Sequence, residues 1–572
     1  MSGRAPIQRR AAAADYERWQ WPADMHRVLR QVLARRAIGS PEELVLELKH
    51  IVPVGRFDAL EAAVELLLAH RDRHVVVLGD FDADGATSTA LAVATLRDLG
   101  FARVGFFIPD RFELGYGLSP EVVARVMPLA PSLIMTVDNG ISSVAGTAAA
   151  RAAGVDVLIT DHHLAPDVLP DANVLVNPNL PGDAFPGKQL AGVGVVFYLL
   201  AALGGALGKR NAVTEYLDLV ALGTVADLVR LDRLNRILVE QGVRRIRAGR
   251  CRPGVRALCE VAGVEPGDVT AATLGFQVGP RLNAAGRLDD MSVGVRCLLA
   301  ASDAEAVPIA ATLDELNRSR RELETRMKAE AIALVDSLEP LAGERLPALI
   351  CLRHDDWHEG LVGLIASRLK DRYHRPAFVF APSETGALKG SGRSIPGLHL
   401  RDALADVDAS HPGLIERFGG HAMAAGLTIA AESFGRFERA IVEVARARLG
   451  EEALAERILT DGEIDPADMS LSVARMLRDA GPWGQGFPEP CFDGRFELVD
   501  YRLLKGAHLK MTLRPLGGGP IVDAIAFNRA ACEWEIGAEL LVVYRLAVND
   551  FPATPRVQLI VTYLAASVDE TL

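Results

Sequence analysis

Five short runs rich in β-branched residues alternate with alanine-rich stretches in the first half of the chain. These runs are VVVLGD (75–80), VGFFIPD (104–110), LIMTVDNG (133–140), VDVLITDHH (155–163) and NVLVNPN (173–179). Short apolar runs that are bounded by turns and separated by helices predict a parallel, doubly wound sheet. The expected fold class is therefore α/β, with a Rossmann-like parallel sheet. At 572 residues the chain is too long for a single core, so further domains should follow.

Acidic and histidine residues lie at the ends of three of these runs. The first run leads into GDFDADG, the third ends in VDNG, and the fourth ends in TDHH. The residues concerned are Asp80, Asp82, Asp84, Asp138, Asp161, His162 and His163. Because the carboxyl ends of parallel strands meet at one edge of a sheet, we expect these side chains to converge on one crevice.

Several carboxylates in one small site repel each other and need cations to coexist. The set combines oxygen and imidazole ligands without thiolate, which favours Mn²⁺ or Mg²⁺ over structural zinc. Two such ions can activate water and stabilise the leaving oxygen of a phosphoester. The sequence therefore predicts hydrolysis of an anionic substrate with two Mn²⁺ or Mg²⁺ ions as cofactors.

Each element of this pattern has a simpler explanation when it is taken alone. An aspartate such as Asp84 or Asp138 at a strand end often caps the next helix. DxDxDG also resembles a calcium loop, although no glutamate follows at the expected position. An NAD-type enzyme is a weaker alternative, because no GxGxxG follows the first strand. Helix capping alone does not readily explain three acid-rich strand ends in one sheet.

DFDADG, VDNG and TDHH, in this order, resemble the successive motifs of the DHH phosphoesterase family. A fourth family motif, an aspartate on a helix after the sheet, is matched by LGTVADLVRL (222–231) and nominates Asp227. The resemblance implies that Asp138 bridges two ions and that His163 lies beside the leaving oxygen. The implied metal ligands are Asp80, Asp82, Asp84, Asp138, His162 and Asp227, and the implied catalytic residues are His163, Asp138 and Asp161. Other branches of the family carry a different residue at the position of Asp80, so Asp80 is expected either as a ligand or as a residue that contacts the ligands.

Later segments resemble the RecJ branch of this family, namely GPRLNAAGRLDD (279–290), WHEGLVGLIASRL (357–369), KGSGRSIPGLHL (389–400) and PWGQGFPEP (482–490). FGGHAMAAG (418–426) resembles the signature of the DHH-associated domain; a tightly packed glycine-rich helix start is the alternative. KGSGRS is interpreted as a glycine-spaced loop that binds phosphate. The expected nucleic-acid or phosphate contacts are Arg111, Arg281, Ser391, Arg393, Gly420 and His421. Arg281 and Arg287 fit interdomain salt bridges equally well.

The pattern of elements divides the chain into five parts. They are an N-terminal helical arm (1–50), a DHH catalytic domain (51–302), a connecting helix (303–337), a second α/β, DHH-associated domain (338–455) and a C-terminal domain (456–572). The last part contains five strand-like runs, which predict an OB-fold β-barrel. Tyr501 and Trp483 are candidates for base stacking, although each fits a core position as well.

The resemblance implies a 5′-to-3′ exonuclease that acts on single-stranded DNA, releases 5′-phosphorylated products and serves repair and recombination. It also implies a single-strand-binding protein and other repair proteins as partners of a monomeric enzyme. We expect a cytoplasmic location, since the sequence shows neither a membrane-length apolar run nor an apolar signal segment. Other DHH hydrolases and a catalytically idle DNA-binding scaffold are the alternatives. The net charge of −12 argues against bulk coating of nucleic acid.

Overall fold

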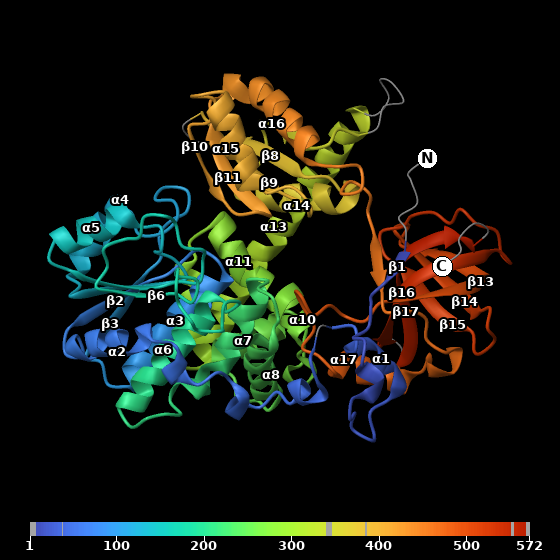
Figure 1. Ribbon diagram of the computed structural model, residues 1–572, viewed down its shortest axis with the longest axis horizontal. Helices are drawn as coiled ribbons and strands as arrows, with labels where there is room; N and C mark the ends of the chain where they lie inside the picture. Colours follow the sequence, from blue (N-terminus) through green and yellow to red (C-terminus); the bar gives the residue numbers. More distant parts are fainter. Residues whose placement is uncertain (1–6, 37, 339–345, 384–385, 551–553, 568–572) are drawn as a thin grey trace. The chain divides into compact units, whose positions relative to one another are not determined.

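The chain divides into two compact units. The computed structural model describes residues 7–36, 38–338, 346–383, 386–550 and 554–567. One unit comprises Gln8–Glu315 and Leu459–Leu572, and the other comprises Met1–Ile7 and Leu316–Ile458. The predicted connecting helix is present as α13 (Asp303–Leu338), which begins in the larger unit and continues into the smaller one (Figure 1).

The larger unit contains the predicted parallel sheet. Its strands are β2 (His74–Leu78), β3 (Arg103–Phe107), β4 (Leu133–Val137), β5 (Asp156–Thr160) and β6 (Val174–Val176). They lie in the order β3-β2-β4-β5-β6, and all pairs are parallel. The chain places β3 on one side of β2 and β4 on the other. The strand order therefore reverses between β2 and β4, which is where open α/β sheets bind ligands.

Helices cover both faces of this sheet (Figure 1). The helices α4 (Pro120–Val126) and α5 (Val144–Ala152) pack on one face, where their valines and alanines meet Val76, Ile134 and Val157 in a buried cluster. The opposite face is covered by α3 (Ala83–Asp98), in which every residue from Ala83 to Leu96 is buried. Small residues dominate α3, so that α6 (Gly192–Ala206) and α7 (Leu217–Ala226) can pack closely against it.

The smaller unit contains a mixed sheet in the order β10-β11-β9-β8-β7. Its strands are β7 (Ile350–Arg353), β8 (Ala377–Pro382), β9 (Leu388–Arg393), β10 (Arg417–Gly420) and β11 (Ala424–Ile429). The interpretation of KGSGRS as a loop is wrong, because this segment is strand β9. Gly390 and Gly392 face the rings of Phe380 and Phe378, where an added Cβ would lie 2.3 and 2.4 Å from ring carbons. The glycines thus make room for the core, and the polar residues between them point to the other face.

The C-terminal region forms the predicted five-stranded barrel. Its strands close in the order β13-β14-β15-β17-β16. Their bounds are β13 (Phe492–Leu504), β14 (His508–Pro515), β15 (Val522–Ala526), β16 (Glu539–Asn549) and β17 (Arg556–Ala566). Trp483 is buried and donates from Nε1 to the Leu477 carbonyl, so it is a core residue, whereas Tyr501 is 39% exposed.

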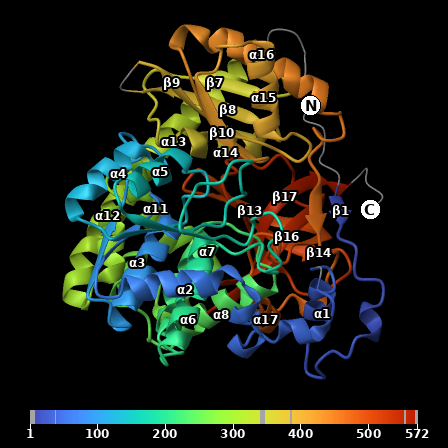
Figure 2. The same ribbon diagram turned by 60° about the vertical axis from the view of Figure 1, so that its left-hand side comes forward.

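The N-terminal arm is only partly helical, contrary to the expectation for residues 1–50. It contains β1 (Ile7–Arg9), which pairs with β12 (Ile458–Thr460), and one α-helix, α1 (Arg27–Leu33), beside α17 (Leu471–Asp479) in both ribbon views (Figures 1 and 2). The arm is fixed by a buried ion pair. Arg36 Nη1 and Nη2 lie 2.5 and 2.8 Å from the carboxylate of Asp461. The arginines of this arm therefore have tertiary contacts that helical periodicity does not predict.

The remaining helices complete the two units. They are α2 (Ala59–Ala69), α8 (Arg233–Arg247), α9 (Pro253–Val261), α10 (Ala271–Thr273), α11 (Gly279–Leu288), α12 (Ser292–Leu299), α14 (Val362–Tyr373), α15 (Leu400–Ser410) and α16 (Phe434–Arg448). Among the residues that the structure describes, no helix has the length and apolar character needed to cross a bilayer.

Candidate metal centre

The first acidic motif is shaped by the turn from β2 into α3. Asp82 caps α3, because its Oδ1 accepts the Gly85 amide at 2.9 Å. Asp84, in the first turn of α3, accepts two amides from the start of α6, Gly192 at 2.6 Å and Val193 at 3.0 Å. Capping therefore does describe Asp82, but the Asp84 carboxylate is held by the amino end of a different helix, where the partial positive charge favours an anion.

The second motif places Asp138 in an unusual backbone conformation. Its φ is +61°, in the left-handed region that aspartate and asparagine enter more readily than most residues. The following Asn139 donates from its side chain to the Leu78 and Val137 carbonyls, which ties β4 to β2 at this edge. An added Cβ on Gly192 would lie 2.6 Å from Asp138 Cβ, so a glycine is required for the two segments to meet.

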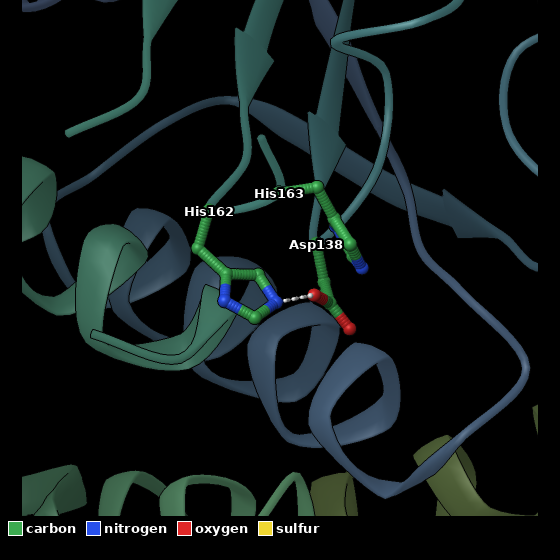
Figure 3. Close-up of side chains that lie close together, drawn as sticks. All are labelled: Asp138, His162 and His163. Atoms are coloured by element: carbon green, nitrogen blue, oxygen red, sulfur yellow. Dashed lines mark ion pairs between the residues drawn. The ribbon is translucent and has the colours of Figure 1, made fainter. Parts of the chain in front are cut away.

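The third and fourth motifs meet the second at His162. His162 Nε2 lies 3.1 Å from Asp138 Oδ1 and 3.6 Å from Asp227 Oδ2. Figure 3 shows the imidazole of His162 pointing at the Asp138 carboxylate, with His163 beside them. Asp227 follows the last residue of α7 as its C-cap rather than lying within the helix, and the next residue, Leu228, has a φ of +60°.

The structure brings all six predicted metal ligands into overlapping groups. Within each group, one ligand atom per residue lies within 4.8 Å of the others. The groups are Asp80, Asp82 and Asp138; Asp84, His162 and Asp227; and Asp138, His162 and His163. Asp138 and His162 each belong to two of these groups. The donor set of carboxylate oxygens and imidazole nitrogens fits Mn²⁺ or Mg²⁺.

Burial and like charges raise the pKa of four of these carboxyl groups. For Asp80 and Asp138, burial comes first and neighbouring aspartates second, and both pKa values lie well above the ordinary range. The same two causes raise the pKa of Asp84 to about 7 and that of Asp227 well above its ordinary value. A site that disfavours its own negative charges in this way favours a bound cation.

Asp161 holds His163 instead of joining the ligand groups. Its buried carboxylate accepts the amides of Ile141, His162 and His163 and lies 2.7 Å from His163 Nδ1. Burial by itself would raise the pKa of Asp161, but the hydrogen bond and charge of His163 lower this pKa overall. Burial lowers the pKa of His163, but the hydrogen bond and charge of Asp161, together with the charges of Asp80 and Asp82, raise it overall. The Asp161 carboxylate therefore fixes the orientation of the His163 ring through Nδ1.

Two residues at the site were not predicted from the sequence. Tyr116 donates to the Asp138 carbonyl at 3.1 Å, contacts His163 and is 44% exposed. Asn283 on α11 accepts the Ala83 amide at 2.8 Å and so supports the turn that carries Asp82 and Asp84. Neither has a sequence signal of its own: Tyr116 lies in a loop, and Asn283 acts across 200 residues.

The predicted phosphate contacts have different surroundings. Arg111 lies over the ring of Phe81 at 4.5 Å, next to the first acidic motif. Arg281 Nη2 lies 2.8 Å from Asp314, and Arg281 also donates to the Val261 and Gln277 carbonyls, so it makes a salt bridge within the larger unit rather than between the two units.

In the smaller unit, Arg393 Nη1 donates to Ser391 Oγ at 3.0 Å and to the Gly392 carbonyl. Gly420 has a φ of +138° and His421 forms a tight hairpin between β10 and β11, which rules out the helix-start alternative for this motif.

Comparison with known domain families identifies three parts of the chain. The DHH family N-terminal domain matches residues 74–224, the DHHA1 domain matches residues 346–447 and the RecJ OB domain matches residues 460–563. The first match contains every predicted ligand except Asp227. Together with the site geometry, these matches define a DHH-family protein with a C-terminal barrel.

Full-length relatives identify the branch. "Single-stranded-DNA-specific exonuclease RecJ" of Salmonella typhimurium (strain LT2) is 49% identical over 97% of this chain and 98% of its own length. The protein with the same name from Escherichia coli (strain K12) is 49% identical over 94% of this chain and 96% of its own length. The crystal structure of RecJ in complex with Mn²⁺ from Thermus thermophilus gives a TM-score of 0.83 at 29% identity, covering 99% of this chain and 80% of that one. A Mg²⁺ complex from the same organism gives 0.76 at 28% identity, covering 98% and 78%. The chain belongs to the RecJ family.

Proposed function

We propose that this chain is a two-metal exonuclease that hydrolyses single-stranded DNA from its 5′ end and releases 5′-phosphorylated products. The observation that carries the proposal is the group of five buried or partly buried carboxylates and one imidazole at this edge of the sheet, in which Asp138 and His162 each belong to two overlapping sets. The relatives named as single-stranded-DNA-specific exonucleases support the substrate, and those solved with Mn²⁺ and Mg²⁺ support the cofactors.

Asp80, Asp82, Asp84, Asp138, His162 and Asp227 are the residues that would hold the two ions. When bound, Mn²⁺ or Mg²⁺ ions supply charge neutralisation at the phosphoester and activation of water. The chain itself contributes orientation and a proton. His163 is fixed by Asp161 at 2.7 Å, and its raised pKa favours the protonated form. We assign to His163 Nε2 the donation of a proton to the leaving oxygen.

The smaller unit offers a site for the phosphate at the strand terminus. The Arg393 guanidinium is partly buried, its pKa is lowered by that burial, and no carboxylate of the described residues pairs with it. Ser391 Oγ and the guanidinium of Arg393 lie next to Gly363, in the first turn of α14, where an added Cβ would lie 3.0 and 3.1 Å from them. A partly buried cation, a hydroxyl and the amino end of a helix are together complementary to a phosphate.

Further parts of the proposal concern the cell. We infer a cytoplasmic location, a role in DNA repair and recombination, and a single-strand-binding protein as a partner of a monomeric enzyme.

Gly420 and His421 form a second proposed phosphate contact, because the hairpin exposes His421 at its tip. Of the two proposed arginines in the larger unit, Arg111 remains assigned to the substrate strand, whereas the contacts of Arg281 support a structural role.

The proposal is tested with single-stranded oligonucleotides labelled at either end. With Mn²⁺, the 5′-labelled strand should release a short labelled fragment at once, while the 3′-labelled strand shortens progressively. EDTA should abolish both. Arg393→Gln should lower the rate on a 5′-phosphorylated strand more than on a 5′-hydroxyl strand, whereas Arg446→Gln, which removes an exposed arginine of the same unit, should change neither. Progressive shortening of the 5′-labelled strand would contradict the polarity, and hydrolysis restricted to dinucleotides would contradict the substrate.

A further inference from the structure

A cavity formed by residues outside the metal centre is lined by arginines of the N-terminal arm. It has a volume of about 560 Å³. The arm contributes Arg9, Tyr16, Arg27, Arg30 and Arg35, and Glu463 after β12 contributes an acid. Four cations therefore face one carboxylate in a cavity that no step of the proposed hydrolysis uses.

Two of these arginines are already neutralised by the protein. Arg9 Nη2 lies 2.5 Å from Glu463 and 2.6 Å from Asp493. Arg27 Nη2 lies 3.1 Å from Asp465 and 2.8 Å from Asp468. Glu463, the acidic residue of the lining, is thus paired with Arg9 and does not neutralise the charges of Arg30 and Arg35.

Arg30 and Arg35 have only neutral partners among the described residues. Arg30 Nη2 donates to the Pro22 carbonyl at 3.3 Å, and its buried Nε makes no hydrogen bond in the part of the chain that the structure describes. Arg35 donates from Nε to the Arg10 carbonyl at 3.0 Å and from Nη1 to the Gln31 carbonyl at 2.8 Å. Carbonyl oxygens orient a guanidinium without cancelling its charge, so both groups favour an anion.

One aromatic residue lines the same cavity as these arginines. Tyr16 lines the cavity and is partly exposed, and its carbonyl accepts the Nε1 hydrogen of Trp21 at 3.0 Å. Trp21 in turn packs against Trp19, with their ring centroids 5.3 Å apart, so the turn that carries Tyr16 is fixed. Guanidinium groups next to a partly exposed ring match the repeating unit of an unpaired strand, a phosphate followed by a base with a free face. A paired base in a duplex offers no such face.

We propose that this cavity is a second contact for single-stranded DNA, in which Arg30 and Arg35 bind backbone phosphates and Tyr16 stacks on an unpaired base. The inference rests on the proposed function only in that the strand is the substrate of the enzyme. The contact adds affinity for the strand at a place where no hydrolysis occurs.

The test is the salt dependence of binding to an oligo-dT of about 30 nucleotides by the full chain in EDTA, which prevents cleavage. A lost phosphate contact on a single strand reduces the slope of log K against log salt by about 0.7, so Arg30→Gln/Arg35→Gln should reduce it by about 1.4. Arg30→Lys/Arg35→Lys keeps both charges and should retain the slope, which separates lost charge from a disturbed arm. The matched control, Arg296→Gln/Arg446→Gln, removes two exposed arginines elsewhere and should leave the slope unchanged.

An unchanged slope in the glutamine variant, or an equal decrease in the control, would overturn the phosphate contact. Tyr16→Ala should weaken oligo-dT binding about 5- to 150-fold and leave binding to a duplex of the same length unchanged. Equal affinity of wild type and Tyr16→Ala for oligo-dT would overturn the stacking. Cleavage with Mn²⁺ is measured in parallel. If DNA is cleaved but the glutamine variant keeps the wild-type salt slope, only this contact is refuted. If the glutamine variant has the reduced slope but wild type never cleaves DNA, only the exonuclease activity is refuted.

Discussion

Replacing Asp138 by asparagine should stabilise the metal-free protein while abolishing its activity. The carboxylate of Asp138 belongs to groups whose ligand atoms lie within 4.8 Å of one another. At this separation and an effective dielectric constant of about 20, two like charges repel by about 3.5 kcal/mol. Proton uptake by the carboxyl groups relieves part of this repulsion. His162 relieves another part, because its Nε2 lies 3.1 Å from Asp138 Oδ1. We therefore expect a net gain of about 1–3 kcal/mol for the metal-free variant at about pH 8. Asparagine also accepts the φ of +61° at this position.

The assay is thermal unfolding at about pH 8 in EDTA and in Mn²⁺, with nuclease activity measured on the same samples. Asp138→Asn should raise the apparent Tm in EDTA by about 2–12 °C, since about 2–4 °C accompanies each kcal/mol in a sizeable domain. It should also lose most of the Tm increase that Mn²⁺ gives to wild type, and its activity should fall at least about 1,000-fold. Asp138→Ala is the matched control, because it removes the same charge but places alanine in a left-handed conformation. A lower Tm of Asp138→Asn in EDTA, or an undiminished response to Mn²⁺, would refute the reasoning.

Three further predictions follow from particular contacts. The pKa of Asp84 is raised from 3.8 to about 7, so the metal-free fold holds this proton more tightly than the unfolded chain and loses stability as the pH rises from about 4 to 7. Mn²⁺ should therefore raise the Tm more at about pH 8 than at about pH 5, and equal increments would contradict this. Gly392→Ala should lower the free energy of unfolding by about 1–3 kcal/mol in urea titration, because the new Cβ would lie 2.4 Å from a Phe378 ring carbon; an unchanged midpoint would show that the ring moves freely. Asp461→Asn should cost about 3–5 kcal/mol, because it leaves the buried Arg36 guanidinium without its ion pair, and a wild-type midpoint would disprove that role.

The convergence of the acidic strand ends could be predicted from the sequence because the relevant physics is local. Strands such as β2 and β4 are continuous apolar runs, and a carboxylate directly after such a run stands out. Parallel pairing then brings these strand ends together without further information. Asp227 was placed by resemblance alone, since its position after α7 has no comparable local pattern.

The rest could not be predicted because it depends on distant partners. The amides of Gly192 and Val193 that hold Asp84 are more than one hundred residues away from it. Strand β9 was interpreted as a loop because glycine has low strand propensity, and only the rings of Phe378 and Phe380 explain why glycine is needed there. The local pattern of the N-terminal arm predicts a helix. Its observed conformation depends on distant contacts such as the ion pair to Asp461, which spans most of the chain.

Dependence of hydrolysis on two bound ions is tested most directly by counting the Mn²⁺ ions that the protein binds, by equilibrium titration with EPR detection of free Mn²⁺, alongside hydrolysis of single-stranded DNA. We expect two ions per chain in wild type, fewer in Asp138→Asn, and hydrolysis from the 5′ end that appears only as the second ion binds. Two ions bound equally well by Asp138→Asn, or full hydrolysis with no ion bound, would show that hydrolysis does not depend on two ions held at Asp138.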